Sequence, residues 1–427
     1  MIDQVNENNQ LQAIHTLDHL QGPVLGMTLS DDGQLLATFC VLGHVSIWDV
    51  RQNFKLLRKL RDKDETQIDE FYCGLFKENY MLTAGKLKDR YRWSETDEDC
   101  HILPCPIKIF DLETDKVIGR LEGHSEEILC IKSLKFEDKN YYITTSQDGY
   151  IFKWHMENDW ITLVDSQCMG DGVTCMAFTV SFLPNTGNKY FLGACDAHLK
   201  LYDFEQAQVM QTFENMYSSY CDCGKFIHWL DEIEYITNQK KYKEIDKENK
   251  EDVTEKNKSK GKGKGKAKEI DIKKGEKEED EDTIVNIDEM DEDDHDQREY
   301  AWFISRGAEM CDIDDGVSST PNTCTLHRLW YPKQSGDPFQ LEEIKKYKHE
   351  DYHSNSWLVK IASNGRYLFA PTLYGQIFVF NILTGQVTSI IKEHQDMEVR
   401  DIIIHPYFPL LISCGDDGTA RVYTWKE

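Results

Sequence analysis

Short apolar runs separated by turn residues recur along most of the chain. Within residues 24–50, for example, apolar runs at Val24–Leu29 and Leu35–Cys40 flank the turn Ser30–Gly33, and a third run, His44–Val50, follows. The runs are five to seven residues long and rich in β-branched and aromatic residues, and they show no helical period. This pattern predicts an all-β protein built from short antiparallel strands.

The same order of strands and turns returns at residues 128–154 and again at residues 399–423. In three copies a turn aspartate precedes an aromatic residue by six positions. These pairs are Asp148 and Trp154, Asp196 and Tyr202, and Asp417 and Tyr423. Self-similarity at a fixed spacing predicts a repeat architecture, in which each copy is one supersecondary unit.

These copies resemble the WD-repeat β-propeller family. The resemblance rests on Gly123-His124 at the start of a repeat, on Asp148-Gly149 at a tight turn, and on an aromatic–aspartate pair that closes the third strand. Such pairs are Trp48-Asp49, Phe110-Asp111 and Tyr202-Asp203. The resemblance implies an all-β, seven-bladed β-propeller. We expect its blades at residues 24–61, 70–123, 126–168, 172–216, 217–349, 354–394 and 397–427.

The resemblance also implies a buried hydrogen-bonded network within a blade. In the family, a repeat-start histidine, a hydroxyl residue, the turn aspartate and the third-strand tryptophan form it. In the third blade these residues are His124, Ser146, Asp148 and Trp154. Other copies depart from the pattern, because Leu42 and Tyr374 occupy the position of the turn aspartate and Gly415 that of the serine. We interpret the network as structural.

The two ends of the chain are expected to close the ring. The last copy stops after its third strand, and residues 11–17 have the pattern of the missing fourth strand. Pairing the two would remove both exposed sheet edges. Residues 1–10 are predicted to form a flexible N-terminus ahead of this strand.

A highly charged segment interrupts the fifth blade. Residues 240–299 contain 16 Lys and Arg and 22 Asp and Glu, with few aliphatic side chains. Such a segment cannot bury enough apolar surface to fold, so we predict a disordered insertion between propeller segments 11–239 and 300–427. Its lysine tract, Lys258–Lys268, is either a solvated run or a nuclear-import or polyanion-binding element.

Charge and composition limit the classes of function. The chain has a formal net charge of −27, of which −21 lies outside residues 240–299, so nucleic-acid binding by the propeller is not expected. No apolar run is long enough to cross a bilayer, and the N-terminus lacks the pattern of a secretion signal. The 13 cysteines are interpreted as reduced core thiols. A nuclear or cytoplasmic location is therefore expected.

Residue patterns for catalysis and metal binding are absent from the sequence. Nucleophile–base, zinc-protease, dinucleotide and phosphate-loop spacings do not occur. The nearest approach to a metal site is Cys221 and Cys223 with His228, whose spacing is poor for tetrahedral zinc. We predict buried thiols there, no catalytic residues, no cofactor and no enzymatic activity.

Two local patterns predict contacts with other proteins. The run Trp48-Asp49-Val50-Arg51 resembles the signature of WD-repeat substrate receptors of cullin-RING ubiquitin ligases, in which the arginine helps to dock the adaptor; Leu42 departs from that signature. Second, the insertion Lys86–Pro106 carries Arg90, Tyr91, Arg92 and Trp93, residue types that are enriched in binding hot spots. Alternatively, its aromatic rings fold back over the second blade.

The function predicted from these patterns is a protein-interaction scaffold that presents basic or mixed-charge partners to a larger complex. Three alternatives remain open at this point. They are a substrate receptor of a cullin-RING ligase, a histone-tail reader in chromatin, whose basic ligand would suit an acidic disc, and a propeller-based enzyme.

Overall fold

The computed structural model describes most of the chain and divides it into two units. The described residues are 11–18, 22–64, 69–87, 90–96, 98–241, 298–313, 316–334, 336–354, 356 and 358–425. The first unit comprises Met1–Trp229 and Tyr300–Glu427, and the second Leu230–Glu299. The predicted flexible N-terminus lies outside the described residues, and so does the predicted disordered insertion over residues 242–297. In the second unit, a helix over residues 232–241 takes in the first two positions of that insertion.

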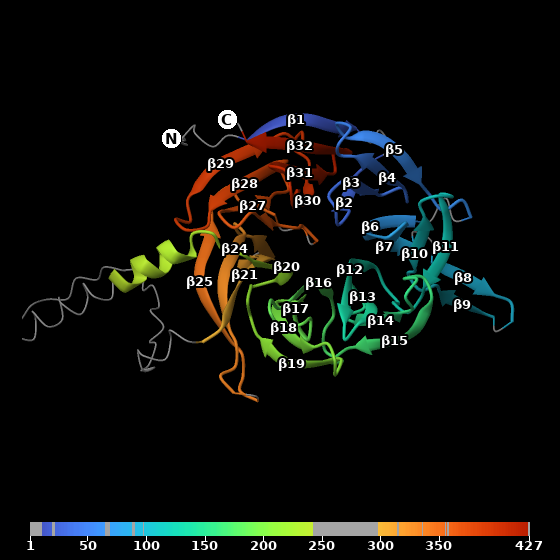
Figure 1. Cartoon of the computed structure of the whole chain (residues 1–427), viewed down its shortest axis with the longest axis horizontal. Helices are drawn as coiled ribbons and strands as arrows, with labels where there is room; N and C mark the ends of the chain where they lie inside the picture. The colour runs from blue at the N-terminus through green and yellow to red at the C-terminus, as the bar shows by residue number, and fades with distance from the viewer. Residues whose placement is uncertain are drawn as a thin grey trace, which may run out of the picture. The chain divides into compact units, whose positions relative to one another are not determined.

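The first unit is a seven-bladed β-propeller, and each blade is a four-stranded antiparallel sheet (Figure 1). From the innermost strand outward, blade 1 contains β2 (Val24–Leu29), β3 (Leu35–Cys40), β4 (Val45–Asp49) and β5 (Lys55–Leu60); blade 2 contains β6 (Asp69–Lys77), β7 (Tyr80–Leu87), β10 (Ile107–Asp111) and β11 (Lys116–Leu121); blade 3 contains β12 (Ile128–Phe136), β13 (Lys139–Ser146), β14 (Ile151–Met156) and β15 (Leu163–Met169). Blade 4 contains β16 (Ala177–Phe182), β17 (Tyr190–Cys195), β18 (His198–Asp203) and β19 (Gln208–Phe213); blade 5 contains β20 (Tyr220–Ile227), β21 (Tyr300–Ala308), β24 (Thr323–Trp330) and β25 (Gln340–Lys348). Blade 6 contains β26 (Ala362–Ser363), β27 (Tyr367–Pro371), β28 (Gln376–Asn381) and β29 (Val387–Lys392); blade 7 contains β30 (Val399–Ile404), β31 (Leu410–Gly415), β32 (Thr419–Trp425) and β1 (Leu11–Asp18). The predicted fold class and the number of blades are confirmed.

The N-terminal strand closes the ring as expected. β1 pairs antiparallel with β32 from Leu11 opposite Trp425 to Asp18 opposite Thr419. Leu17 is buried against Val24 of blade 1 and Ala420 of blade 7, so the strand also packs between the first and last blades. The two ends of the repeat array therefore share one sheet, and neither blade 1 nor blade 7 presents an open end.

Two additional hairpins connect second to third strands. In blade 2, β8 (Tyr91–Ser94) and β9 (Asp99–Ile102) lie within the predicted insertion Lys86–Pro106. In blade 5, β22 (Met310–Ile313) and β23 (Gly316–Ser319) form a hairpin that the sequence analysis did not identify.

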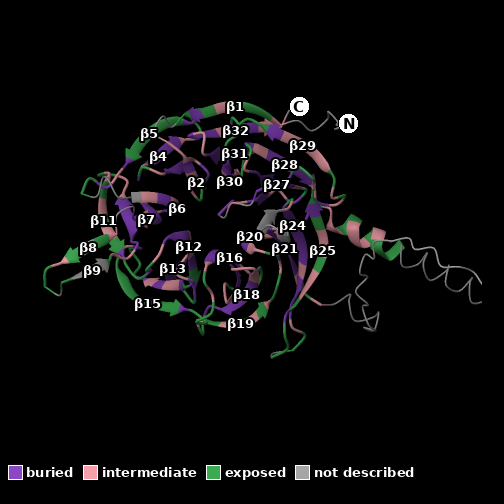
Figure 2. Ribbon diagram, turned by 180° about the vertical axis from the view of Figure 1, so that it is seen from behind, coloured by how far each residue is buried: buried purple, intermediate pink, exposed green. Residues whose placement is uncertain are grey.

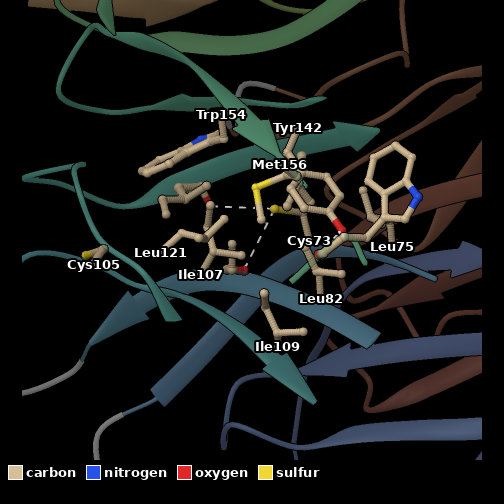
Figure 3. Packing of buried hydrophobic residues seen from close by; sticks show 14 residues of the cluster. Cys73, Leu75, Leu82, Cys105, Ile107, Ile109, Leu121, Tyr142, Trp154 and Met156 are labelled. Carbon is tan, nitrogen blue, oxygen red and sulfur yellow. Dashed lines mark hydrogen bonds between the residues drawn. The ribbon is translucent and has the colours of Figure 1, made fainter. Parts of the chain in front are cut away.

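Most of the apolar burial lies between neighbouring blades. The inner strands are largely buried, whereas the outermost strands are more open: β11 and β19 alternate exposed and half-buried residues, and β5 and β15 are exposed along most of their length (Figure 2). Between blades 2 and 3, Trp154, Tyr142 and Met156 of blade 3 pack on Leu82 and Ile107 of blade 2 (Figure 3). Burial between blades explains why copies with incomplete motifs still form regular sheets.

The network of the third blade differs from the expected one in a single member. His124 Nδ1 lies 3.0 Å from a carboxylate oxygen of Asp148, and its Nε2 lies 2.8 Å from the hydroxyl of Thr144. That hydroxyl also accepts a 2.9 Å hydrogen bond from Trp154. Thr144 therefore holds the position that we assigned to Ser146, whose hydroxyl instead accepts a hydrogen bond from the Asp148 backbone.

The last blade contains a second network of the same kind. His394 contacts Asp417 at 3.1 Å and the hydroxyl of Ser413 at 2.7 Å, and Tyr423 takes the place of the tryptophan. The expectation that Gly415 leaves this blade without its hydroxyl is therefore corrected, because Ser413, two positions earlier, supplies it. In both blades burial favours the protonated acid, but the hydrogen bond and the charge of the histidine, together with backbone hydrogen bonds, outweigh it and hold the pKa of Asp148 and of Asp417 below the ordinary value.

Candidate partner-binding surfaces

The two faces of the disc carry different connections. We call the face formed by the loops between blades and by the turns from second to third strands the top face. The turns from first to second and from third to fourth strands form the bottom face. Binding residues lie disproportionately on loops held by a rigid scaffold, so each face offers a separate candidate surface.

Six of the seven innermost strands carry a β-bulge at the same height, near the top face. The register shifts by one residue close to the first residue of β2, β6, β12, β16, β20 and β30. The residues left out of the pairing are Leu25, Tyr72, Leu129, Phe178, Asp222 and Arg400. We call these six residues the bulge ring. Bulges redirect side chains and are common beside functional sites.

One side of the bulge ring is apolar. Leu129 and Phe178 are fully buried and cluster with Leu358 of the segment that precedes β26. Tyr72 and Tyr220 pack on this cluster and are half-buried. The rings of Phe178 and Tyr220 lie 5.8 Å apart. Residues from blades 2 to 6 thus meet in one apolar cluster.

The other side of the bulge ring is charged. Asp222 and Arg306 form an ion pair in which both side chains are fully buried. Burial raises the pKa of Asp222 above its ordinary range despite the opposing charge of Arg306. Burial alone would lower the pKa of Arg306, but the charge of Asp222, together with smaller contributions from neighbouring tyrosines and Cys324, outweighs burial and raises that pKa. Further hydrogen bonds satisfy part of each group, while Asp222 Oδ1 and Arg306 Nε have no hydrogen-bond partner among the described residues.

Those further hydrogen bonds tie blade 5 to the segment that leads into blade 6. Arg306 donates to the backbone oxygens of Ser354 and Ser356, and the backbone NH of Val359 donates to Asp222 at 3.1 Å. Asn322 also accepts a 2.8 Å hydrogen bond from the backbone of Ser354. The ion pair therefore positions the irregular segment that carries Leu358.

Arg400 is the second charged member of the bulge ring. Its guanidinium binds Asp416 at 2.8 Å and Glu398 at 2.9 Å, and one of its nitrogens lies 3.2 Å from the hydroxyl of Ser356. Glu398 is only 8% exposed, and its Oε1 lacks a hydrogen-bond partner among the described residues. Burial raises the pKa of Glu398, although Arg400 opposes the shift. A carboxylate with an unsatisfied oxygen is thus held at this edge of the bulge ring.

Exposed apolar side chains stand on the top face where the turn aspartate is missing. Tyr374 is 55% exposed, and Met397, in the loop between blades 6 and 7, is 45% exposed. The two turns are in contact, because Val399 donates a 3.1 Å hydrogen bond to the backbone of Thr372. The hydroxyl of Thr372 accepts hydrogen bonds from the backbone NH groups of Tyr374 and Gln376. It thus takes the role of the missing aspartate in the turn, and the side chain of Tyr374 remains exposed.

Arg51 lies on the bottom face, on the turn between β4 and β5. Asp49 caps this turn by accepting hydrogen bonds from the backbone of Arg51 at 2.9 Å and of Gln52 at 3.1 Å. Arg51 is exposed, and across the residues that the structure describes its guanidinium has no hydrogen-bond or ion-pair partner. The pKa of Asp32 lies below its ordinary value, chiefly because Ser30 and the backbone of Gln34 donate hydrogen bonds to its carboxylate. The positive charge of Arg51 adds a smaller effect in the same direction.

The four residues predicted at the β8–β9 hairpin have different environments. Tyr91 and Trp93 are each 64% exposed and do not cover blade 2. The side chain of Arg92 lies outside the described part. Arg90 is only 13% exposed, because it forms an ion pair with Glu126 at 2.9 Å and donates to the Ser125 backbone at 2.7 Å. It therefore anchors the hairpin and is not available to a partner.

The structure shows no metal centre within the described ranges. No group of three or more His, Cys, Asp and Glu side chains there is placed to hold a metal ion. Cys221 and Cys223 are buried on β20, and burial raises the pKa of both thiols, whereas His228 is exposed. None of the described helices is both long and apolar enough to cross a bilayer.

Two comparisons with known proteins agree with this geometry. The family model described as WD domain, G-beta repeat matches residues 11–49, 115–155 and 385–424, and the last two segments contain the histidine networks of blades 3 and 7. The chain thus carries WD40 repeats, and the resemblance to WD-repeat propellers is confirmed. A WD40 propeller of this kind indicates a protein-interaction scaffold.

A more specific relative is found over a short stretch. The chain is 36% identical over 62 residues to the DDB1- and CUL4-associated factor 11 homolog of Caenorhabditis briggsae. The match covers 14% of this chain and 11% of the length of that protein.

Sequence reasoning missed the bulge ring and the Tyr374–Met397 pair. Bulge residues share a position but not a residue type, so composition gives no signal for them. In the sequence, Tyr374 occupies the position of the turn aspartate. This departure from the motif was the available signal that an apolar side chain is exposed there.

Proposed function

We propose that this protein is a non-enzymatic scaffold whose top face binds an amphipathic, partly basic segment of a partner protein. The observation that carries the proposal is the combination, on one face, of exposed Tyr374 and Met397 with the exposed acidic residue Asp396. Asp396 and Met397 are adjacent in the chain and both are exposed, so an apolar contact and a salt bridge are both within reach of one ligand. Aromatic and methionine side chains are enriched at protein interfaces.

Replacing both Tyr374 and Met397 by serine is expected to reduce the recovery of top-face partners at least tenfold, since two exposed apolar contacts are removed. Quantitative affinity purification of the tagged full-length protein measures this effect. The matched control replaces Met210 and Leu56, which are 48% and 39% exposed on outermost strands. Equal recovery with both double variants and the wild type would contradict the proposal, and loss with the control alone would place the contacts on the outer rim.

The second candidate function is that of a substrate receptor of a cullin-RING ubiquitin ligase. Two observations favour it: the exposed guanidinium of Arg51 on a turn that Asp49 holds in place, and the similarity to a DDB1- and CUL4-associated factor. A guanidinium without an internal partner can make a forked, charge-assisted contact with an adaptor. Exposed Tyr407, whose hydroxyl donates to the backbone of Asp31 at 3.1 Å, lies on the same face beside blade 1.

If DDB1 co-purifies with the wild type, we expect the Arg51→Ala variant to recover at least tenfold less of it, because the substitution removes a charge-assisted contact from a docking arginine. Quantitative mass spectrometry of the purified complexes tests this. Arg366→Ala, at an exposed position in a bottom-face turn of blade 6, is the matched control and should retain DDB1. Absence of DDB1 from all three samples would rule out the receptor function.

A further inference from the structure

The β8–β9 hairpin presents one continuous apolar face. Tyr91 pairs with Ile102 and Trp93 pairs with Cys100, and because side chains alternate across a strand, these four lie on the same side of the ribbon. Tyr91 and Trp93 are each 64% exposed, and Ile102 is 52% exposed. Cys100 is exposed as well. Exposed contiguous apolar patches of this kind mark interaction sites in soluble proteins.

The base of the hairpin is fixed to the propeller. The backbone of Leu103 donates to that of Arg90 at 2.8 Å and so extends the ladder beyond β8 and β9. Arg90 then binds Ser125 and Glu126 in the loop that leads into blade 3. Beyond this anchor the hairpin projects past the outer edge of the disc (Figures 1 and 2). Its apolar face is therefore held out in a defined orientation, which limits the entropy lost when it binds.

The charge near the hairpin indicates the chemistry of its partner. The turn between the two strands and the first residue of β9 have the sequence Glu-Thr-Asp-Glu-Asp over residues 95–99, with four acidic residues in five. Glu95 and Glu98 are exposed. Such a turn repels anionic lipid headgroups, and it also repels a second copy of this strongly acidic chain. It attracts a protein surface that carries lysine or arginine side chains.

We propose that the β8–β9 hairpin is a docking arm that inserts Tyr91, Trp93 and Ile102 into an apolar groove of another protein, with basic side chains of that protein around the acidic turn at residues 95–99. Tyrosine and tryptophan are the residue types that dominate binding hot spots. The arm is separate from the top-face pair Tyr374 and Met397 and from Arg51, so it does not depend on either proposed function.

Site-specific photocrosslinking of the full-length protein tests the proposal. In the Trp93→benzoylphenylalanine variant, the photoreactive ring occupies the centre of the apolar face. We expect one protein to be crosslinked, through a peptide that contains apolar residues with lysine or arginine nearby. The same probe at Ile118, 44% exposed on the outermost strand of blade 2, is the control and should not capture it.

The affinity for the captured protein provides the second readout. With both proteins purified, Trp93→Ser should raise Kd at least about 30-fold, as expected for a hot-spot residue. The Glu95→Lys, Glu98→Lys double variant should raise Kd about tenfold and weaken its dependence on salt, and Ile118→Ser should leave Kd unchanged. Crosslinks only to lipid or to this same chain, capture no stronger than at Ile118, or an unchanged Kd for Trp93→Ser would each overturn the proposal.

Discussion

Replacing Arg306 by methionine is expected to lower the free energy of unfolding by about 3–5 kcal/mol, the typical cost of removing one partner from a buried ion pair. The variant would leave the fully buried Asp222 without its countercharge and the backbone oxygen of Ser356 without this donor, and the backbone oxygen of Ser354 would keep only its bond from Asn322. Urea unfolding followed by tryptophan fluorescence measures the change. Because the pair positions the segment that carries Leu358, we also expect weaker binding on the top face.

Two further variants separate the ion pair from the loss of a large side chain. Combining Arg306→Met with Asp222→Leu removes both charges and should restore much of the lost stability. Arg58→Met breaks the ion pair with Asp115, whose side chains are 41% and 47% exposed, and should cost less than about 1 kcal/mol. If Arg306→Met were as stable as Arg58→Met, the pair would not be buried as described.

The closing strand provides the second large effect. Leu17→Asp is expected to lower the free energy of unfolding by at least about 3 kcal/mol, because it removes a buried leucine and places a carboxylate between blades 1 and 7. Leu17 is 4% exposed and packs with Val24 and Ala420. The same urea titration measures the loss, and limited proteolysis should show earlier cleavage in blades 1 and 7.

Ile14 on the same strand provides the matched control. It is 41% exposed and lies at the register shift between Ala13 and His15, so Ile14→Asp should change stability by no more than about 0.5 kcal/mol. Wild-type stability in both variants would mean that β1 does not hold the ring closed in solution.

Repetition made the architecture predictable. Seven copies of one strand pattern, with the seventh lacking its last strand, were sufficient to expect both the number of blades and the closure by residues 11–17. Each blade is specified by alternating apolar and polar positions and by turn residues that recur from copy to copy. A copy with an incomplete motif can therefore be recognised from the regular copies beside it. The hairpin β22–β23 occurs in only one blade, and repetition therefore gave no help with it.

The errors at the networks have one physical cause. Thr144 and Ser146, like Ser413 and Gly415, lie two positions apart on a strand, so in each pair both residues face the same way and sequence pattern cannot separate them. Only the register of the strands decides which hydroxyl meets the histidine. The bulge ring could not be predicted from the sequence for a related reason. A one-residue register shift does not require a particular residue type, and the six positions hold Leu, Tyr, Leu, Phe, Asp and Arg.

The split fifth blade has a practical consequence for protein engineering. Ile227 of β20 and Trp302 of β21 are directly paired, so the chain leaves and re-enters the propeller at adjacent points. The entropy cost of closing a loop grows only slowly with its length, by about 0.6 kcal/mol for each doubling. A compact reporter protein whose own termini are close together can therefore replace part of residues 242–297 without stretching either strand. The protein can then be labelled while β1 remains in the closing sheet.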